Sequence, residues 1–449
     1  MVPLSLLTFS VLLWKPYVIE AAAKFISQPL YFFRFSFLRA PTCIHQVITA
    51  LVCGLLFCLP AVCSEGGRSA FVGLDSNNSL VIRPPTNGLV LIDGADIRAL
   101  VAKVETQAQQ LEALKQQVAN QYTRCVTVTD TLAITGSNSG NQWTGGVLAN
   151  NGKIYGIPYL STSVLIIDPS TNTADVTTIT GLSGSAKWRG GVLAGNGKIY
   201  GIPHSSASVL IIDPATNTTD TTTITGLSGA CCQWYGGVLA SNGKIYGIPY
   251  DSTSVLIIDS TTNTSDTTTI MGLSGGSKWR GGVLTSNGKI YGIPGSSPSV
   301  LIFDPATTTA DTTTLTGFSG ANKWDGGVLA GDGKIYCLPL GSASVLIIDP
   351  TTNTADTTSI TGLSGSGSKW SGGVLAGNGQ IYGIPFDSAS VLIIDPTTNT
   401  ADTTTVTGLS GGAKWLGGVL AGNGQVYGFP YDRKSALIVQ SACMLTRGL

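Results

Sequence analysis

Residues 188–229 read WRGGVLAGNGKIYGIPHSSASVLIIDPATNTTDTTTITGLSG, and closely similar units precede and follow them. Each unit begins at a tryptophan, and successive tryptophans are 45 or 46 residues apart. They are Trp143, Trp188, Trp234, Trp279, Trp324, Trp370 and Trp415. A fixed period of this length is typical of repeat architectures in which each unit is one supersecondary motif.

Each unit divides into four short β-strands. In the unit that starts at Trp188, the first strand carries GGVLA, and Asn196-Gly197 then favours a two-residue hairpin because both residues tolerate positive φ. The second strand is KIYGIP, and the third, SVLIID, is apolar without alternation, so both its faces should be buried. A Pro-x-Thr-Asn turn leads to a fourth strand, DTTTIT, whose threonines suit an outer edge. Four such strands are typical of a β-propeller blade.

The two ends of the repeat region indicate a closed ring. Residues 130–135 form a fourth strand with no partners of its own, and the last unit ends after its third strand, residues 435–440. This arrangement predicts an all-β, seven-bladed β-propeller over residues 123–449, with the last blade shared between the N- and C-terminal strands. Cys125 and Cys443 fall in the same turn of that closing blade, so we expect a disulfide between them.

The run NGKIYGIP…VLIIDPxTNT resembles the kelch repeat family of β-propellers. Members of that family share a double glycine, here Gly145-Gly146 through Gly417-Gly418, and a tyrosine in the second strand, here Tyr155 through Tyr427. This chain departs from the family pattern because its tryptophan directly precedes the double glycine instead of following the Thr-Asn-Thr turn. The resemblance implies a propeller that mostly binds partners. A few relatives are galactose oxidase-like copper enzymes, whose site would need two histidines in the ring, where only His204 is present.

The residues before the repeats have a different composition. Residues 1–64 have a net charge of +3, and the apolar run 47–62 has the length of a signal-peptide core, so this segment is expected to be a signal peptide or a signal anchor, or to precede a later start codon. Residues 65–96 are expected to be a loop-rich spacer. Residues 97–122 carry a heptad pattern, which predicts a coiled-coil stalk in a homodimer or homotrimer, or else a lone amphipathic helix packed on the next domain. The localisation expected is extracellular or in the secretory pathway, with a membrane anchor through 47–62 as the alternative.

Composition narrows the function. Lys+Arg and Asp+Glu are equal at 25 each, which argues against a nucleic-acid partner. The two histidines of the chain argue against a multi-histidine metal site, so no metal and no cofactor is expected.

Differences between the otherwise similar units indicate where a ligand binds. The residues after each tryptophan and after each second-strand proline vary, and in a propeller both positions open on the same face. This loop face collects aromatic, basic and acidic side chains around a central depression, which suits a glycan, a peptide or a protein partner. The candidate ligand-binding residues are Arg189, His204, Tyr235, Tyr250, Asp251, Arg280, Asp325, Phe386, Asp387, Tyr431 and Asp432.

Three functions fit this pattern. We expect non-catalytic binding at the loop face; the alternatives are a glycoside hydrolase-like enzyme that uses Asp387 and Asp432 as a carboxylate pair, and a structural display protein. The opposite face repeats the same Lys and Asp residues in nearly every blade, which indicates turn capping and charge pairing. Candidate N-glycosylation sites are Asn77, Asn217 and Asn263. Cys231-Cys232 is a vicinal pair in an inter-blade loop, and Cys337 is expected to fill the core.

Overall fold

The computed structural model describes residues 61–65, 68–74, 80–83, 91–92, 95–96, 102–111, 113, 124–136, 140–365 and 367–444. The chain forms two compact units, residues 1–121 and 122–449. In the first unit, β1 (Ala61–Glu65), β2 (Arg68–Leu74) and β3 (Leu80–Arg83) make a three-stranded sheet, and β4 (Leu91–Ile92) pairs with β5 (Ala95–Asp96). The expected loop-rich spacer, residues 65–96, therefore contains paired strands.

The targeting segment and the stalk are described only in part. Of the residues expected to form a signal or anchor, 1–60 lie outside the described residues, and Ala61–Glu65 form β1. Residues 102–111 are helical, and Val104 and Leu111, two core positions of the predicted heptad, are 58% and 53% exposed. Within the described part of the chain, no helix has the length and hydropathy needed to cross a membrane. Oligomerisation through this helix stays a prediction.

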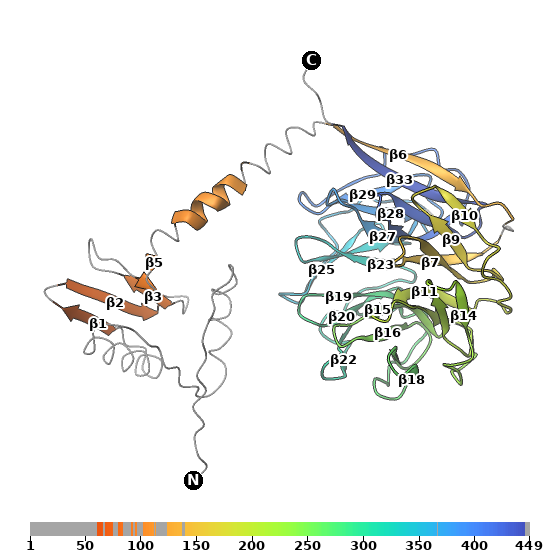
Figure 1. The fold of residues 1–449 in the computed structure, drawn as a ribbon, viewed down its shortest axis with the longest axis horizontal. Helices are drawn as coiled ribbons and strands as arrows, with labels where there is room; N and C mark the ends of the chain where they lie inside the picture. Colours follow the sequence, from red (N-terminus) through yellow and green to blue (C-terminus); the bar gives the residue numbers. More distant parts are fainter. Residues whose placement is uncertain are drawn as a thin grey trace, which may run out of the picture. The chain divides into compact units, whose positions relative to one another are not determined.

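The second unit is a ring of seven four-stranded antiparallel sheets, which confirms the predicted seven-bladed propeller (Figure 1). The innermost strands start at the tryptophans: β7 (Trp143–Leu148), β11 (Trp188–Leu193), β15 (Trp234–Leu239), β19 (Trp279–Leu284), β23 (Trp324–Leu329), β27 (Trp370–Leu375) and β31 (Trp415–Leu420). The second strands are β8 (Ile154–Pro158), β12 (Ile199–Pro203), β16 (Lys244–Pro249), β20 (Ile290–Pro294), β24 (Ile335–Pro339), β28 (Ile381–Pro385) and β32 (Val426–Pro430). The third strands are β9 (Leu165–Asp168), β13 (Leu210–Asp213), β17 (Leu256–Asp259), β21 (Leu301–Asp304), β25 (Leu346–Asp349), β29 (Leu392–Asp395) and β33 (Ser435–Met444).

The fourth strands differ from the prediction. They are β10 (Thr173–Asp175), β14 (Thr218–Asp220), β18 (Thr264–Asp266), β22 (Thr309–Asp311), β26 (Thr354–Asp356) and β30 (Thr400–Asp402), so each ends at the aspartate with which the expected strand DTTTIT begins. The terminal aspartate explains this. The Asp220 carboxylate accepts hydrogen bonds from the backbone N–H groups of Thr222 and Thr223 and from both their hydroxyls. This side-chain cap turns the backbone out of the ladder after three residues.

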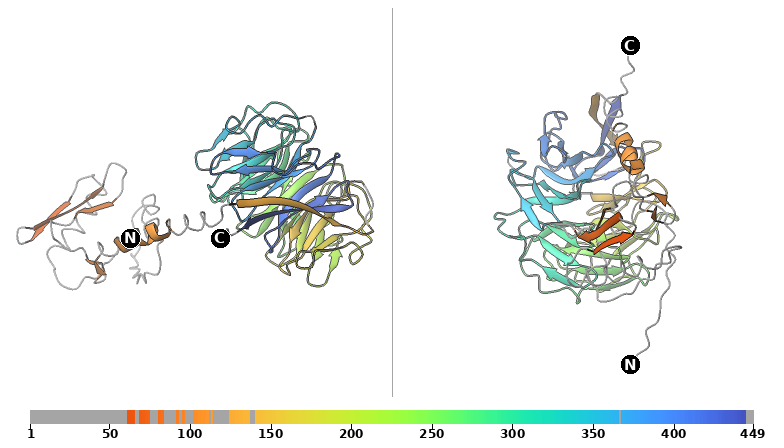
Figure 2. Two further views of the ribbon diagram at one scale, coloured as in Figure 1. Left: turned by 90° about the horizontal axis from the view of Figure 1, so that it is seen from above. Right: turned by 90° about the vertical axis from the view of Figure 1, so that its left-hand side faces the viewer.

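The closing blade joins the two ends of the ring. Its strands run in the order β31-β32-β33-β6, with β6 (Arg124–Ala133) supplied by the N-terminal side, as predicted (Figure 2). The two cysteines of the predicted disulfide lie in these long strands, and not in a turn as expected, because the Val-Thr-rich start of β6 extends the ladder. Cys443 is nevertheless the direct register partner of Cys125.

Glycines let the inner strands converge at the axis. Gly190 adopts φ +73°, and a Cβ there would lie 3.0 Å from the Cα of Gly236 in the next blade. A Cβ on Gly191 would lie 2.6 Å from the Cδ1 atom of Ile157 in the preceding blade. The double glycine therefore serves both close approach at the axis and packing between blades.

Two sets of recurring contacts fix each blade to its neighbour. Trp188 is buried in a cluster with Tyr155 and Ile157 of the preceding blade, and its Nε1 donates to the carbonyl of Ser208, 2.8 Å away. On the opposite face, the Tyr155 hydroxyl donates to Oδ1 of Asn217 in the next blade, 2.8 Å away. Equivalent tyrosine-to-asparagine bonds end at Asn172, Asn263, Asn353 and Asn399. Two of the candidate glycosylation residues, Asn217 and Asn263, thus lie in turns between the third and fourth strands of a blade, where they contact the preceding blade, and Asn77 lies outside the described residues.

Candidate functional site

Side chains that directly follow the tryptophans meet at the mouth of the ring. The first residue after each tryptophan lies just before the glycine bulge, so these positions from successive blades face a common centre. Nη2 of Arg189 donates to the hydroxyl of Tyr235, 2.6 Å away, and this hydroxyl donates to Oδ2 of Asp325, 2.7 Å away. The same Oδ2 accepts a hydrogen bond from Ser371, at 2.5 Å, and lies 3.7 Å from Nη1 of Arg280.

Arg189 is the cation of this group that lacks an anionic partner. Its guanidinium stacks on Tyr235, with Cζ 3.8 Å from the ring centroid, and lies 5.8 Å from the ring centroid of Tyr159. Among the described residues it makes no ion pair with a carboxylate, and its buried Nε has no hydrogen-bond partner. Because Asp325 pairs with Arg280, the group keeps one uncompensated positive charge. Such a charge, held in a partly desolvated position, favours an anionic ligand group.

An arc of aromatic rings lies at the same mouth of the ring as the arginines. Phe386, Tyr431, Tyr159, His204 and Tyr250 follow the second-strand prolines of five successive blades around the ring. Neighbouring centroids in that order are 5.4, 6.2, 5.7 and 6.0 Å apart. In the remaining two blades this position is Gly295 or Leu340. We call the five rings together with Arg189, Tyr235, Arg280, Asp325 and Ser371 the aromatic–arginine cluster.

His204 is neutral in this environment. Burial lowers its pKa to about 4, and the nearby Arg189 charge acts in the same direction. Its Nδ1 lies 3.1 Å from the carbonyl oxygen of Trp234. Since a carbonyl only accepts, Nδ1 carries the proton and Nε2 carries the lone pair.

The structure brings together eight of the eleven predicted ligand-binding residues and gives the other three different surroundings. Asp251 accepts a hydrogen bond from the backbone N–H of Ser277, and Asp387 accepts from the N–H groups of Ser368 and Ala413. These carboxylates cap loops, and Asp432 is exposed. The alternative of a catalytic Asp387–Asp432 pair therefore has no support from the contacts of Asp387.

The sequence comparison missed two members of the cluster and a structural lysine. Tyr159 and Ser371 stand at the same variable positions as the predicted residues, so comparing units could have identified them. The lysine before the tryptophan, by contrast, points inward. Lys187 is 3% exposed, and its Nζ donates to the carbonyls of Tyr159, Ser161 and Gly184. Burial lowers its pKa to about 8.

Three further cysteines have defined positions. Cys231 and Cys232 form a disulfide in the loop before Trp234, with their Cα atoms 3.7 Å apart. Cys337 is fully buried, as expected of a core filler, and burial raises the pKa of its thiol.

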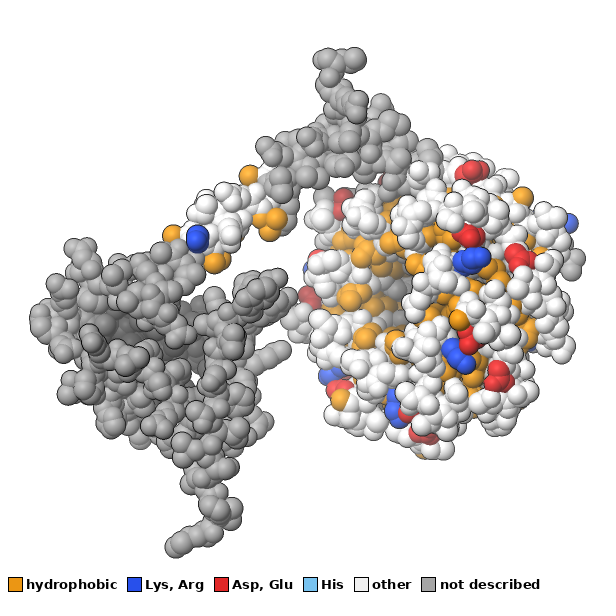
Figure 3. Space-filling view, in the orientation of Figure 1, with side chains coloured by type: hydrophobic (Ala, Val, Ile, Leu, Met, Phe, Trp, Pro, Cys, Tyr) orange, Lys and Arg blue, Asp and Glu red, His pale blue; other side chains and the backbone are white. Residues whose placement is uncertain are grey.

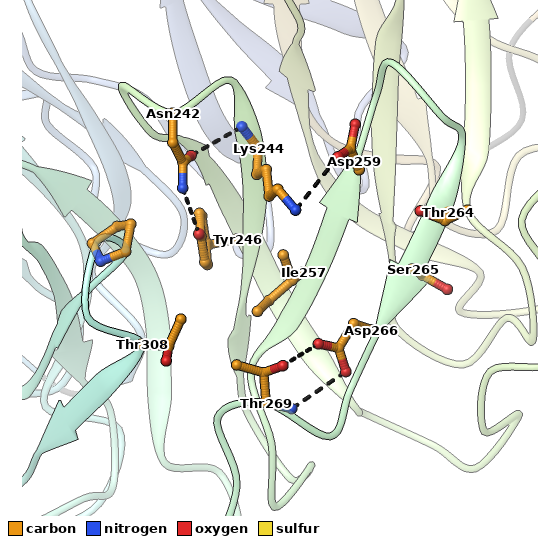
Figure 4. Close-up of a pocket in the computed structure, with 11 residues that line it drawn as sticks. Asn242, Lys244, Tyr246, Ile257, Asp259, Thr264, Ser265, Asp266, Thr269 and Thr308 are labelled. Atoms are coloured by element: carbon orange, nitrogen blue, oxygen red, sulfur yellow. Dashed lines mark hydrogen bonds and ion pairs between the residues drawn. The ribbon is translucent and has the colours of Figure 1, made fainter.

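The opposite face carries ion pairs and a groove. Lys153–Asp168, Lys198–Asp213 and Lys244–Asp259 are separated by 3.6, 3.5 and 3.4 Å between nitrogen and oxygen, as the predicted charge pairing requires. Figure 3 shows basic and acidic side chains side by side at several places on the propeller. A groove between two blades is lined by Tyr246, Asp266 and Thr308, among others (Figure 4). Thr308 stands where five other blades have the bonded asparagine.

Comparisons with known proteins support the fold. No protein family model and no curated protein matches this sequence. Streptogramin B lyase has a similar structure, with a TM-score of 0.58 and 12% identity over 70% of this chain and 98% of the lyase chain. The extracellular domain of a hybrid two-component system from B. thetaiotaomicron matches with a TM-score of 0.56 and 14% identity, over 72% of this chain and 44% of that chain. The WD40 repeats of RRP9 match with a TM-score of 0.53 and 12% identity, over 70% of this chain and 97% of that chain.

These similarities define the class of this protein and correct one expectation. The chain is a seven-bladed β-propeller; its membership of the kelch family stays a prediction. We expected a protein without catalytic activity. That expectation is wrong as an inference from the fold, because the propellers that resemble this chain include an enzyme, streptogramin B lyase. At 12% identity this similarity carries the fold and no particular reaction.

Proposed function

We propose that the propeller binds a ligand with an anionic group, on a glycan or a peptide, at the aromatic–arginine cluster. The observation that carries the proposal is the partly buried Arg189 guanidinium, which has aromatic neighbours and no carboxylate partner among the described residues. A carboxylate, sulfate or phosphate would accept hydrogen bonds from it in the bidentate geometry that guanidinium groups favour. The flanking tyrosines and Phe386 would contact sugar rings or apolar side chains.

The remaining sequence expectations complete this proposal. Secretion or membrane anchoring through residues 47–62 would place the loop face outside the cell. Pairing of the helix in residues 97–122 would make binding multivalent and raise avidity without new contacts. A protein partner that presents an acidic side chain to Arg189 fits the same chemistry as a free peptide.

The test uses calorimetric titration of the full chain with matched ligands that do or do not carry an acidic group. Ligands come from a glycan and peptide array screen. Arg189→Leu is the test variant, because Leu416 occupies the equivalent position in another blade. We expect it to weaken acidic ligands at least about tenfold, as for loss of a charged hydrogen bond. Mass analysis of the same mixtures would detect any turnover.

Lys198→Gln is the matched control. It also removes one positive charge, but on the opposite face, and Gln380 and Gln425 occupy its position in other blades. We expect this variant to bind acidic ligands within about twofold of wild type, because an exposed charge on the opposite face of the propeller is largely screened from the cluster. Equal losses in both variants, or equal binding of acidic and neutral ligands, would contradict the proposal.

A further inference from the structure

A second constellation shares His204 with the aromatic–arginine cluster and adds two cysteines, to which the proposed anion binding assigns no role. The donor atoms of His204, Cys231 and Cys232 all lie within 4.8 Å of one another. His204 follows the second strand of one blade, whereas the two cysteines precede the inner strand of the next blade. The histidine is buried, Cys232 is half-buried and Cys231 is exposed, so the group opens to solvent on the sulfur side. Two sulfurs and one imidazole make a donor set that thiophilic metal ions prefer.

The hydrogen bond of His204 prepares its other nitrogen for a metal. Because Nδ1–H donates to the carbonyl of Trp234, Nε2 keeps its lone pair. Metal-binding imidazoles in proteins commonly donate their second ring N–H to a carbonyl or carboxylate, which fixes both the tautomer and the orientation of the ring.

The sequence around the cysteines also removes a cation that would oppose metal binding. In five blades a buried lysine precedes the tryptophan, and in the preceding interface the Lys187 ammonium donates to the carbonyl of Tyr159, the counterpart of His204. The cysteine-bearing loop has Gln233 at this position. The charged groups that act on His204 are Arg189, Arg280 and Asp251. Two cysteine thiolates would balance the charge of a divalent cation.

We propose that His204, Cys231 and Cys232 form a redox-gated binding site for a thiophilic divalent cation such as Zn²⁺. In the structure the sulfurs are joined in a disulfide, which closes the site. A dithiol reductant would give two electrons and two protons to the disulfide, yielding two cysteine thiols and the oxidised reductant. On binding, the metal displaces the two thiol protons into solvent, and His204 supplies the third ligand, leaving a fourth position open. One histidine suffices for this set, so the scarcity of histidine does not exclude it.

The experiment is a Co²⁺ titration of the full chain, reduced with a phosphine and desalted without oxygen, because cobalt reports thiolate ligation by absorption. We expect a near-ultraviolet thiolate-to-cobalt band with one equivalent of metal, displaced by Zn²⁺ and absent from the oxidised protein. The double variant Cys231→Ser/Cys232→Ala reproduces Ser185-Ala186 of another blade, so it should fold and lose the band. His204→Tyr, which copies Tyr159, Tyr250 and Tyr431, should weaken cobalt binding at least about tenfold, because it removes one of three protein ligands.

Several outcomes separate this site from the other cysteines and from the proposed function. A band that persists in the double variant assigns the metal to other cysteines and overturns the proposal. Equal cobalt affinity in wild type and His204→Tyr, or equal binding before and after reduction, also overturns it. Arg189→Leu serves as the independent control: loss of anion binding with unchanged cobalt binding would leave the metal site standing on its own.

Discussion

Replacing Thr308 with asparagine should stabilise the propeller. Thr308 adopts φ +56°, a left-handed conformation in which a β-branched residue is strained, whereas asparagine tolerates it. The equivalent asparagines in five blades have φ between 51° and 53°. Four of them accept a tyrosine hydroxyl at 2.7–2.8 Å and the fifth at 3.0 Å. Tyr246, which faces Thr308 across the groove in Figure 4, meets no such asparagine. It accepts a side-chain hydrogen bond from Asn242 within its own blade, as Tyr155 and Tyr200 do from Asn151 and Asn196.

The expected gain can be worked from these contacts. Relief of the left-handed strain contributes about 1 kcal/mol, and a new hydrogen bond from the Tyr246 hydroxyl to the introduced asparagine side chain about 0.5–1.5 kcal/mol. The exposed bond from the Thr308 hydroxyl to the Thr307 carbonyl is lost, which offsets about 0.5 kcal/mol. The net gain of about 1–2 kcal/mol corresponds to a rise in Tm of about 1.5–3 °C for a domain of this size.

A double-mutant cycle with Tyr246→Phe separates the two contributions. Thermal and urea unfolding of wild type, both single variants and the double variant would be compared under one set of conditions. In the Tyr246→Phe background, Thr308→Asn should keep the strain relief and lose the hydrogen-bond gain. A variant no more stable than wild type would refute the reasoning, and an equal gain in both backgrounds would refute the role of the hydrogen bond.

Three further predictions concern other parts of the ring. Hydrogen bonds from Thr223 and Thr222 lower the pKa of Asp220 to about 2, below its unfolded value of 3.8. The ionised carboxylate therefore stabilises the fold above about pH 4, and this stabilisation should be lost as pH falls towards 2. Tm should drop in that pH range, and a Tm independent of pH there would contradict the capping role. Gly190→Ala should destabilise the propeller by about 3 kcal/mol, because the position has a positive φ and a Cβ would meet the backbone of the next blade. Gly195→Ala, where a Cβ meets nothing, should change stability by less than about 0.5 kcal/mol. Similar Tm values for both variants would disprove the crowding at the axis. Non-reducing peptide mapping of oxidised protein should recover a Cys125–Cys443 cross-link, and Cys125→Ser should cost about 2–4 kcal/mol; free thiols at both positions would exclude the disulfide.

The fold was readable from the sequence because its signals are local and repeated. Asn196-Gly197, the apolar third strand and the orphan strand before Trp143 each indicate the blade and its closure without knowledge of distant contacts. The fourth strand was misplaced because threonine-rich sequence resembles a strand by propensity. The Asp220 side chain competes with the ladder for backbone N–H groups, and propensity does not register that competition.

The sequence could predict which residues form the candidate site, but not the hydrogen bonds that join them. Comparing units singled out Arg189, Tyr235 and Asp325, since each interrupts an otherwise regular repeat. The curvature of the ring brings side chains 90 residues apart into contact. It is this curvature that lets the Tyr235 hydroxyl link Arg189 to Asp325. The inward orientation of Lys187 could not be predicted, because a lysine next to a variable loop suggests a solvated side chain. In the structure three carbonyls hold its ammonium inside.

Because β6 and β33 pair within one blade, the ring could be closed there and its first and last strands placed in any other blade. Both strands reach the rim on the Asn-Gly side, where Arg124 pairs with Met444. A short linker between these two residues would yield a continuous circle of seven near-equivalent blades. New termini could then be opened in the turn after any third strand, and each circular permutant would again complete one blade from its two ends. Such permutants would allow a reporter or tether to be placed on any blade while the aromatic–arginine cluster stays intact.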